Sequence, residues 1–387
     1  MGNNRRRTYS SGSKYSGTVI LATSNENSSI EISTSTDGTA FTGRCMINNS
    51  YDVYIEGIKV IGDVLAIATE TSTANKYIYL VKIDDIMNSS SSYGTDIISP
   101  YNIVNRYDSS LYKSYTSITD DGLIFISSVS TSASYYNEIL SVFSIYDNEY
   151  LIDSKVLNPG SSDTSGYYSN LYENFIYLNG FDEGIYITNY ETGTKPRSPK
   201  LIKKLNLTSD ITSSSFIDLS DSFTSLNNFY VIDENKVIYP NYDKSNYPLE
   251  CRQIYKNSSG GYSSNLLWSV ENPYSTHSSN SISVLPINNG KEFYLGGSYS
   301  GVYNSLLILR IDSGTGETLD TYSGNLLSGG YNVRSGLTEL YNEDEIYVTN
   351  YIRNSNSIYS GASLVNMSSH TRIDLAVDLK CGIAVIK

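Results

Sequence analysis

The stretch Gly290-Lys-Glu-Phe-Tyr-Leu-Gly296 places a turn residue before a run of aromatic and apolar residues, and similar stretches recur along the whole chain. A run of this kind, bounded by glycine or asparagine, is typical of a β-strand that follows a tight turn. Such runs begin near residues 17, 62, 122, 174, 235, 290 and 344. The 387 residues divided among these seven units give about 55 residues for each. A repeat of this length predicts equivalent structural units, one after another.

Most of these runs are followed by a second strand-like run, as in Lys76-Tyr-Ile-Tyr-Leu-Val-Lys-Ile-Asp84 and Ser305-Leu-Leu-Ile-Leu-Arg-Ile-Asp312. Apolar residues at consecutive positions indicate that both faces of a strand are covered. The blades of a β-propeller meet this condition, because each sheet lies between two others. We therefore predict an all-β fold in which residues 17–387 form a single seven-bladed β-propeller. The seven repeated runs are expected to be the first strands of the blades.

The last residues, Cys381-Gly-Ile-Ala-Val-Ile-Lys387, form one more strand-like run. A propeller closes its ring when strands from both termini share a blade, which protects sheet edges. We therefore expect residues 382–387 to share a blade with the strand near 17–24. One short helical turn is expected at Ile83–Met87. Hairpin turns are predicted at dipeptides that accept a positive φ: Asp37-Gly38, Asp121-Gly122, Asn179-Gly180, Gly260-Gly261 and Asn289-Gly290.

The net charge of −13 and the pI of about 4.7 argue against a nucleic-acid-binding surface on the propeller body. Residues 1–16 are predicted to be a flexible basic arm containing Arg5, Arg6 and Arg7. This arm is either a solvated tail or an assembly arm that docks on an acidic neighbour or on nucleic acid. No run approaches the roughly 18 apolar residues of a membrane span, and no apolar segment of a secretory signal follows the arginines. The expected location is a virion, or the extracellular space after release without a signal peptide, with the cytoplasm as the alternative.

Residues that commonly carry catalysis or bind metals are few. Cys45, Cys251 and Cys381 lie far apart, without the paired spacing of a zinc site, and are predicted to be small buried residues. His277 and His370 stand in Ser/Asn-rich stretches that are typical of loops. We therefore predict no catalytic residue, no metal site and no cofactor.

Adjacent carboxylates are the remaining candidates for chemistry: Asp84-Asp85, Asp120-Asp121 and Glu343-Asp344-Glu345. They stand at predicted strand ends and turns, where solvated acidic residues keep a protein soluble. Two carboxylates brought close together by folding hydrolyse glycosidic bonds in many enzymes. A carbohydrate-active hydrolase or lyase with carboxylates at the propeller channel is therefore the alternative to a non-enzymatic role.

Residues Leu307–Leu319, Leu-Ile-Leu-Arg-Ile-Asp-Ser-Gly-Thr-Gly-Glu-Thr-Leu, contain a strand that ends in Asp312, followed by a turn through Thr315 and Gly316. This stretch resembles the repeat of quinoprotein-like and kelch-like propellers of bacteria and phages. The resemblance implies the propeller plan and no quinone site, since only the turn is shared. Residues Ser35–Phe41 resemble a degenerate Asp-box of sialidase-type propellers, although the glycine follows Asp37 directly.

Tyrosine is unusually frequent, with 37 residues. Those inside strands (Tyr77, Tyr79, Tyr177 and Tyr347) are explained by packing between blades. Others stand among Ser, Asn and Gly, a composition typical of adaptable binding loops, although compositional drift is an alternative explanation. The candidate binding residues are Tyr135, Tyr136, Tyr167, Tyr168, Tyr262, Tyr299 and Tyr303.

These features together predict a non-enzymatic binding or assembly protein, most simply a bacteriophage tail, baseplate or head-decoration component. The expected partners are other virion proteins, or a glycan or protein of the host surface. The propeller body is not expected to bind nucleic acid or to insert into a membrane, and oligomerisation within an assembly is left open.

Overall fold

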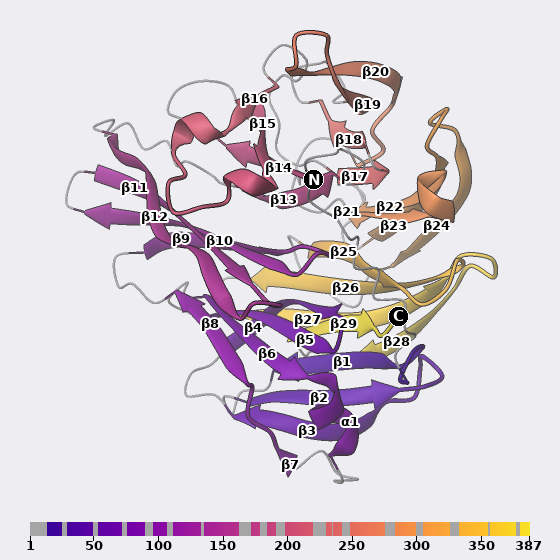
Figure 1. Ribbon diagram of the computed structural model, residues 1–387. Coiled ribbons are helices and arrows are strands. Elements are labelled where there is room, and N and C mark those ends of the chain that lie inside the picture. Colours follow the sequence, from indigo (N-terminus) through magenta and orange to yellow (C-terminus); the bar gives the residue numbers. More distant parts are fainter. Residues whose placement is uncertain are drawn as a thin grey trace.

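The computed structural model of the protein describes residues 14–24, 29–48, 53–71, 76–89, 96–106, 111–132, 135–161, 172–178, 184–190, 198–219, 230–233, 235–241, 248–274, 283–298, 305–325, 333–354, 357–376 and 380–387. Nearly all regular structure in these ranges is antiparallel β-sheet, arranged as a β-propeller (Figure 1). The chain passes from sheet to sheet around the molecule and returns to its first strand. The predicted all-β propeller fold is therefore confirmed.

The strands form seven sheets, which we label A to G and list from one edge to the other. Sheet A contains β29 (Lys380–Val385), β1 (Val19–Ser24), β2 (Ser29–Ser35), β3 (Thr42–Asn48) and β7 (Asp96–Ile97). Sheet B contains β4 (Val53–Ile61), β5 (Val64–Thr71), β6 (Lys76–Lys82) and β8 (Asn102–Arg106). Sheet C contains β9 (Leu111–Ile118), β10 (Leu123–Ser132), β11 (Tyr135–Ser144) and β12 (Glu149–Ser161).

The remaining four sheets each use consecutive strands. Sheet D contains β13 (Tyr172–Leu178), β14 (Ile185–Tyr190), β15 (Ser198–Lys203) and β16 (Ile217–Asp218). Sheet E contains β17 (Tyr230–Asp233), β18 (Lys236–Pro240), β19 (Leu249–Lys256) and β20 (Tyr262–Val270). Sheet F contains β21 (Ser283–Ile287), β22 (Glu292–Ser298), β23 (Ser305–Asp312) and β24 (Thr318–Asn325). Sheet G contains β25 (Val333–Leu340), β26 (Glu345–Asn354), β27 (Ser357–Asn366) and β28 (Thr371–Ala376).

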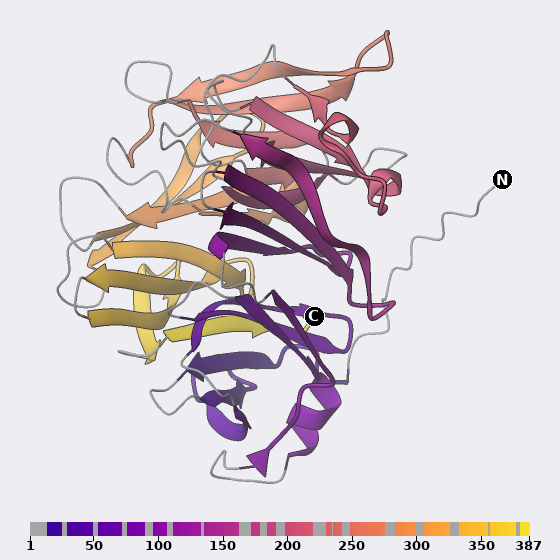
Figure 2. The ribbon, with the colours of Figure 1, turned by 90° about the vertical axis from the view of Figure 1, so that its left-hand side faces the viewer.

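Six sheets, B to G, have the four-stranded antiparallel form of a propeller blade, one fewer than the seven equivalent blades that the repeat predicts. Sheet A differs because it has five strands and takes them from both ends of the chain. Its outer strand β7 pairs with β3 in parallel, unlike every other pair in the described sheets. Figure 2 shows β29, in yellow, beside the indigo β1.

The terminal strands of sheet A pair closely. Val19 in β1 lies opposite Val385 in β29, and the ladder continues to Ser24 opposite Lys380. Beyond the ladder, the amide of Gly17 donates to the carbonyl of Ile386 at 2.8 Å. The prediction that the C-terminal residues pair with the strand near 17–24 is confirmed.

The repeated runs of the sequence were assigned to the wrong position within the sheets. Six of them correspond to the second strand of a sheet: β1, β5, β10, β18, β22 and β26. Only the run near 174 coincides with an edge strand, β13. The second strand is the most apolar because neighbouring sheets cover both its faces. All but one of the residues of β5 are buried. In its edge neighbour β4, buried residues are interspersed with more exposed ones.

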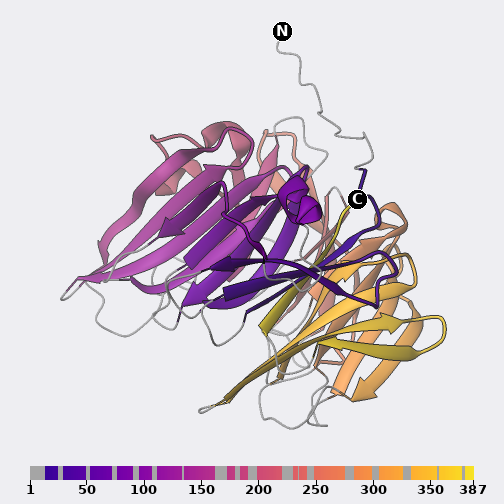
Figure 3. The same cartoon turned by 90° about the horizontal axis from the view of Figure 1, so that it is seen from below.

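Helical structure is limited in the described residues to short segments. The one α-helix, α1 (Ile83–Asn88), follows β6 directly and confirms the helical turn expected at Ile83–Met87 (Figure 3). The 3-10 turns are η1 (Lys204–Asn206), η2 (Ser213–Ser215) and η3 (Asn288–Gly290). None of the helices in the described ranges is long and apolar enough to cross a membrane.

The core lies between neighbouring sheets, and tyrosines of the middle strands are among its largest members. Tyr79, Tyr186, Tyr239, Tyr294 and Tyr347 are almost completely buried. The hydroxyl of Tyr347 donates to the carbonyl of Gly38 in sheet A at 2.9 Å, and that of Tyr294 donates to the carbonyl of Glu343 in sheet G at 2.7 Å. Tyr347 and Tyr294 thus each join one sheet to a turn of the next. Burial in the core explains Tyr79 and Tyr347 by packing, as predicted.

The predicted hairpin turns that fall within the described ranges all have a glycine with positive φ. At Gly122, with φ of 80°, a Cβ atom would lie 2.5 Å from the ring of Tyr146, so both conformation and space require glycine. The dipeptide Asn179-Gly180 lies outside the described residues. The three cysteines are buried and free, as predicted, and burial raises the pKa of each thiol to about 12.

Candidate ligand-binding site

Three of the tyrosines predicted to bind a partner lie in the described residues, and all three stand in strands. Tyr262 lies in β20 and is buried in a cluster with Val237 and Tyr239, so it belongs to the core instead of a loop. Tyr135 and Tyr136 are the first residues of strand β11, also not in a loop. The other candidates lie outside the described residues: Tyr167, Tyr168, Tyr299, Tyr303, Arg5, Arg6 and Arg7.

Each acidic group considered for catalysis has at least one member with a structural partner. Asp84 in α1 accepts from Lys14 Nζ at 2.9 Å and from the Tyr15 hydroxyl at 3.0 Å, which holds the N-terminal residues of the described chain against the helix. Among the other acids, Asp120 pairs with Lys59 at 2.6 Å, and Asp344 lies 3.7 Å from Arg310. These carboxylates are engaged in holding turns and neighbouring sheets.

Asp121 joins sheet C to sheet D. One carboxylate oxygen accepts from Tyr186 Oη and from Lys204 Nζ, both at 2.7 Å, and the other accepts from Thr119 Oγ1 at 2.6 Å. Burial alone would raise the pKa of Asp121, but the bonds from Lys204, Thr119 and Tyr186 hold it below its ordinary value. We refer to Asp121, Tyr186, Lys204 and Thr119 as the Asp121 latch.

The turn that resembles an Asp-box is explained by local hydrogen bonds. Asp37 Oδ1 accepts from the amides of Thr39 and Ala40 and from the Ser35 hydroxyl, at 2.8–2.9 Å. Hydrogen bonds from the backbone amides of Ala40 and Thr39 and from Ser35 lower the pKa of this carboxyl well below its usual range. Asp312 makes the same arrangement with the amides of Gly314 and Thr315. Both aspartates therefore act as turn residues.

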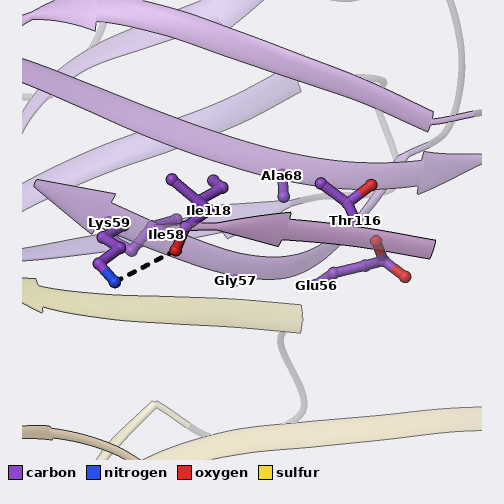
Figure 4. Close-up of a pocket in the computed structure, with 7 residues that line it drawn as sticks. All are labelled: Glu56, Gly57, Ile58, Lys59, Ala68, Thr116 and Ile118. Carbon is purple, nitrogen blue, oxygen red and sulfur yellow. Dashed lines mark hydrogen bonds between the residues drawn. The ribbon is translucent and has the colours of Figure 1, made fainter. Parts of the chain in front are cut away.

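A cavity of about 200 Å³ lies between sheets B and C and is a candidate for a binding site (Figure 4). Its lining comes from the edge strands β4 and β9 and from β5: Glu56, Gly57, Ile58, Lys59, Ala68, Thr116 and Ile118. Figure 4 shows Lys59 at one end of this group and Glu56 and Thr116 at the other, with Ile118 and Ala68 between them.

The space of the cavity is created by small residues that lie opposite each other in β4 and β5. Gly57 in β4 lies opposite Ala68 in β5, and Lys59 lies opposite Ala66. Ala66 and Ala68 belong to the core cluster that sheet B shares with sheet C. The face of sheet B that meets sheet C therefore carries short side chains at these positions. A Cβ atom built at Gly57 has no other atom within 4 Å, which means that the glycine borders open space.

Thr116 is the polar residue that β9 places in the lining of the cavity. It lies opposite the buried Ile126 on the face of sheet C that meets sheet B. Its hydroxyl is buried and has no hydrogen-bond partner among the described residues. Leaving such a group unpaired costs about 1–3 kcal/mol, and such groups in native proteins commonly belong to functional sites or take a ligand or water as partner.

A bulge in β4 places Glu56 at the other end of the cavity. Ile55 lies opposite Thr69 and Gly57 opposite Ala68, so Glu56 has no partner residue in β5. The Glu56 carboxylate forms an ion pair with Lys76, whose side chain is only 3% exposed. Lys76 also lies 3.5 Å from Glu70. Bulges often redirect a side chain beside a functional site.

Lys59 closes the remaining side of the cavity and links the two sheets. Its ammonium group donates to the carbonyl of Ile118 at 3.2 Å and pairs with Asp120 at 2.6 Å. The lining of the cavity thus combines apolar residues and Thr116 with two charged groups, Lys59 and Glu56, that already have partners. Sequence analysis missed this site. The one local signal was Gly57, a glycine inside a strand-like run, which often marks a bulge or a close approach.

Two further ion-pair clusters lie deeper in the sheets. Arg252 contacts the fully buried Glu250 at 3.2 Å, and Arg310 contacts Glu292 at 2.5 Å. Both arginines stand on the third strand of their sheets, β19 and β23, away from the edge strands that contact one another between sheets. No group of three or more His, Cys, Asp or Glu residues in the described ranges could hold a metal ion.

Comparison with known proteins adds a fold-level likeness. No family model matches the chain, and no curated protein matches it in sequence. In structure it is similar to the uncharacterized protein lmo1340 from Listeria monocytogenes EGD-e, with a TM-score of 0.45 and 10% sequence identity. The similarity covers 94% of this chain and 95% of that one.

Proposed function

We propose that this protein is a non-enzymatic binding or assembly protein, and that the cavity between β4 and β9 is its ligand site. The observation that carries the proposal is a cavity between sheets B and C whose charged lining groups, Lys59 and Glu56, already have partners. Binding requires such prepared polar groups, whereas glycoside hydrolysis requires two carboxylates able to exchange protons with a substrate. Three of the acids suggested by the sequence, Asp84, Asp120 and Asp121, are instead bonded to neighbouring segments.

The finer architecture belongs to the same proposal: sheet A is the seventh blade, and it closes the ring. Support comes from the edge strands, which contact one another in order around the molecule. Contacts link β29 to β4, β9 to β13, β13 to β17, β17 to β21, β21 to β25, and β25 to β29. The bond from Lys59 to Ile118 supplies the remaining link between β4 and β9. Class averages from negative-stain microscopy, viewed along the ring axis, are expected to show seven lobes; six lobes or a gap would refute this count.

The partners proposed from the sequence are other virion proteins, or a glycan or protein of the host surface. The body carries the acidic charge, since the four basic residues of the arm, Arg5, Arg6, Arg7 and Lys14, leave 23 basic against 40 acidic residues elsewhere (27 − 4 = 23). A basic arm on an acidic body is compatible with docking between copies or with neighbouring subunits. Location in a bacteriophage tail, baseplate or head remains a prediction, as does extracellular release.

The binding function is tested with a panel of immobilised bacterial glycans and whole-cell surface extracts. The expected result is saturable retention with every retained glycan recovered intact by mass spectrometry. Release of shortened glycans, or of unsaturated products, would instead establish the alternative, a carbohydrate-active hydrolase or lyase. Absence of retention on any glycan or surface extract would overturn the binding proposal.

A further inference from the structure

We infer that the outer edge of strand β20 is a docking edge for β20 of a second copy of this chain, so that two copies of sheet E join into one antiparallel sheet. The inference goes beyond the proposed ligand site and does not depend on it, since the cavity lies between sheets B and C. Figure 1 shows β20 at the outer rim of the molecule, next to β19.

β20 differs from the outermost strands of the other six described sheets because it contains no charged residue. Each of the others carries at least one: Asp96 in β7, Arg106 in β8, Lys155 in β12, Asp218 in β16, Asp320 in β24 and Arg372 in β28. Charged residues keep an outer strand from pairing with strands of other molecules. β20 also contains no proline, and its neighbouring residues Leu266 and Leu267 are 45% and 39% exposed. An outer strand of this composition is suited to pairing with another strand.

The hydrogen bonds of the β19–β20 hairpin show which backbone groups of β20 point outward. The amide of Asn257 donates to the carbonyl of Gly261 at 2.8 Å, so the backbone groups of Gly261 face β19. Because these groups alternate along an antiparallel strand, the N–H and C=O groups of Ser264 and Leu266 point away from β19. No backbone group of another described segment pairs with those of Ser264 and Leu266 on this outer side.

A two-fold axis beside Ser264 brings two such edges into register. Pairing with β19 is regular from Tyr262 to Leu266, and a bulge at Leu267 ends the regular stretch. When Ser264 lies opposite Ser264 of the second copy, Leu266 lies opposite Tyr262 of the second copy. Positions 262, 264 and 266 all direct their backbone groups outward, so the donors of one edge meet the acceptors of the other.

Charge favours a second copy as the occupant of this edge. Antiparallel self-pairing of β20 places no like charges opposite one another, because the strand has none. The charged residues of the hairpin 249–270 are Glu250, Arg252 and Lys256, which give it a net charge of +1 (2 − 1). Two chains with a net charge of −13 each therefore repel one another less at this hairpin than at the acidic remainder of the body.

The test is sedimentation equilibrium of the full-length protein at concentrations between about 1 and 300 μM. The wild type is expected to dimerise with a dissociation constant on the order of 10–100 μM, since one short strand pair buries less than the roughly 1,200 Å² of a stable interface. A wild type that stays monomeric throughout this range overturns the inference and leaves the edge to a strand of another protein.

The salt dependence separates this dimer from one made by the basic arm. Because no charges meet at the β20 edge, the dissociation constant should hardly change between about 50 and 500 mM NaCl. A dimer that is lost at the higher salt concentration overturns the inference, since docking of the basic arm on an acidic body is weakened by salt.

Two variants of β20 locate the contact. Leu266→Lys gives β20 the kind of charge that the other outermost strands carry, and is expected to weaken dimerisation about tenfold. Ser264→Pro removes an outward N–H without breaking a bond to β19, and is expected to weaken dimerisation as well. Circular dichroism melting checks that each variant is folded.

The matched control is Leu319→Lys. Leu319 is 48% exposed on β24, the outermost strand of sheet F, so this variant receives the same substitution at a similarly exposed leucine. It should dimerise like the wild type. Unchanged dimerisation in both folded β20 variants, or equal weakening by Leu319→Lys, overturns the inference; neither result bears on the glycan panel that tests the ligand site.

Discussion

Replacement of Asp121 by asparagine isolates the electrostatic part of the Asp121 latch. Asparagine keeps the shape of the side chain and one acceptor oxygen, so the loss is mainly the charge that faces Lys204 and Tyr186. The side chain of Lys204 is 47% exposed and that of Asp121 is 22% exposed, so the ion pair itself contributes at most about 1 kcal/mol. Weakening the charge-assisted bond from the buried Tyr186 adds about 1 kcal/mol. We therefore expect Asp121→Asn to lower the free energy of unfolding by about 1–2 kcal/mol, and Asp121→Ala by about 3 kcal/mol.

The pH dependence distinguishes charge from packing. The pKa of Asp121 is lower in the folded protein than in the unfolded chain, where about 3.9 is ordinary. The contribution of the Asp121 charge to the free energy of unfolding is therefore complete above the pKa of the unfolded chain. It is lost as the pH falls through the pKa of the folded protein. Urea unfolding followed by circular dichroism should show the wild type more stable than Asp121→Asn at about pH 7, with the difference shrinking toward about pH 3. The reasoning is refuted if the two proteins differ equally at both pH values, or not at all at neutral pH.

The Asp121→Asn measurement needs a partner variant as its control. Lys204→Gln removes the other charge of the same pair, and the double variant should lose less than the sum of the two single changes. Full additivity would show that the two residues do not interact in solution.

Three further predictions concern packing between sheets. Gly316→Ala should destabilise the protein by about 1–3 kcal/mol and shift the fluorescence of Trp268, the single tryptophan. The reason is that Gly316 has φ of +78° and that a Cβ atom there would lie 2.8 Å from the indole ring. An unshifted spectrum with unchanged stability would contradict this. Tyr347→Phe should cost about 0.5–1.5 kcal/mol in urea unfolding through loss of the bond to Gly38, and no loss would mean that this bond does not contribute. The thiols of Cys45, Cys251 and Cys381 should react with Ellman's reagent only after unfolding, since burial raises their pKa to about 12. Rapid labelling of the native protein would show that a buried site opens.

The middle strands of the sheets could be predicted from the sequence because they are buried along their whole length. Both faces of a second strand pack against other sheets, so runs such as Gly62–Ala68 are apolar at consecutive positions and identify the all-β propeller plan. The edge strands were not predictable in the same way. β9 and β25 contain lysine, arginine, serine and glutamate among their apolar residues, and therefore lack the pattern that marks the middle strands.

The candidate site shows most clearly what one sequence leaves undetermined. Gly57, Ala68 and Thr116 are separated by up to 59 positions (116 − 57), and no local pattern joins them. The register of β4 on β5 sets the glycine opposite the alanine, and the contact between sheets B and C brings the threonine to both. The periodicity of apolar residues along a strand shows which faces of that strand are buried, because burial favours apolar residues at every position of a face. A cavity depends on which small residues meet across two sheets, and that is decided only when the chain has folded.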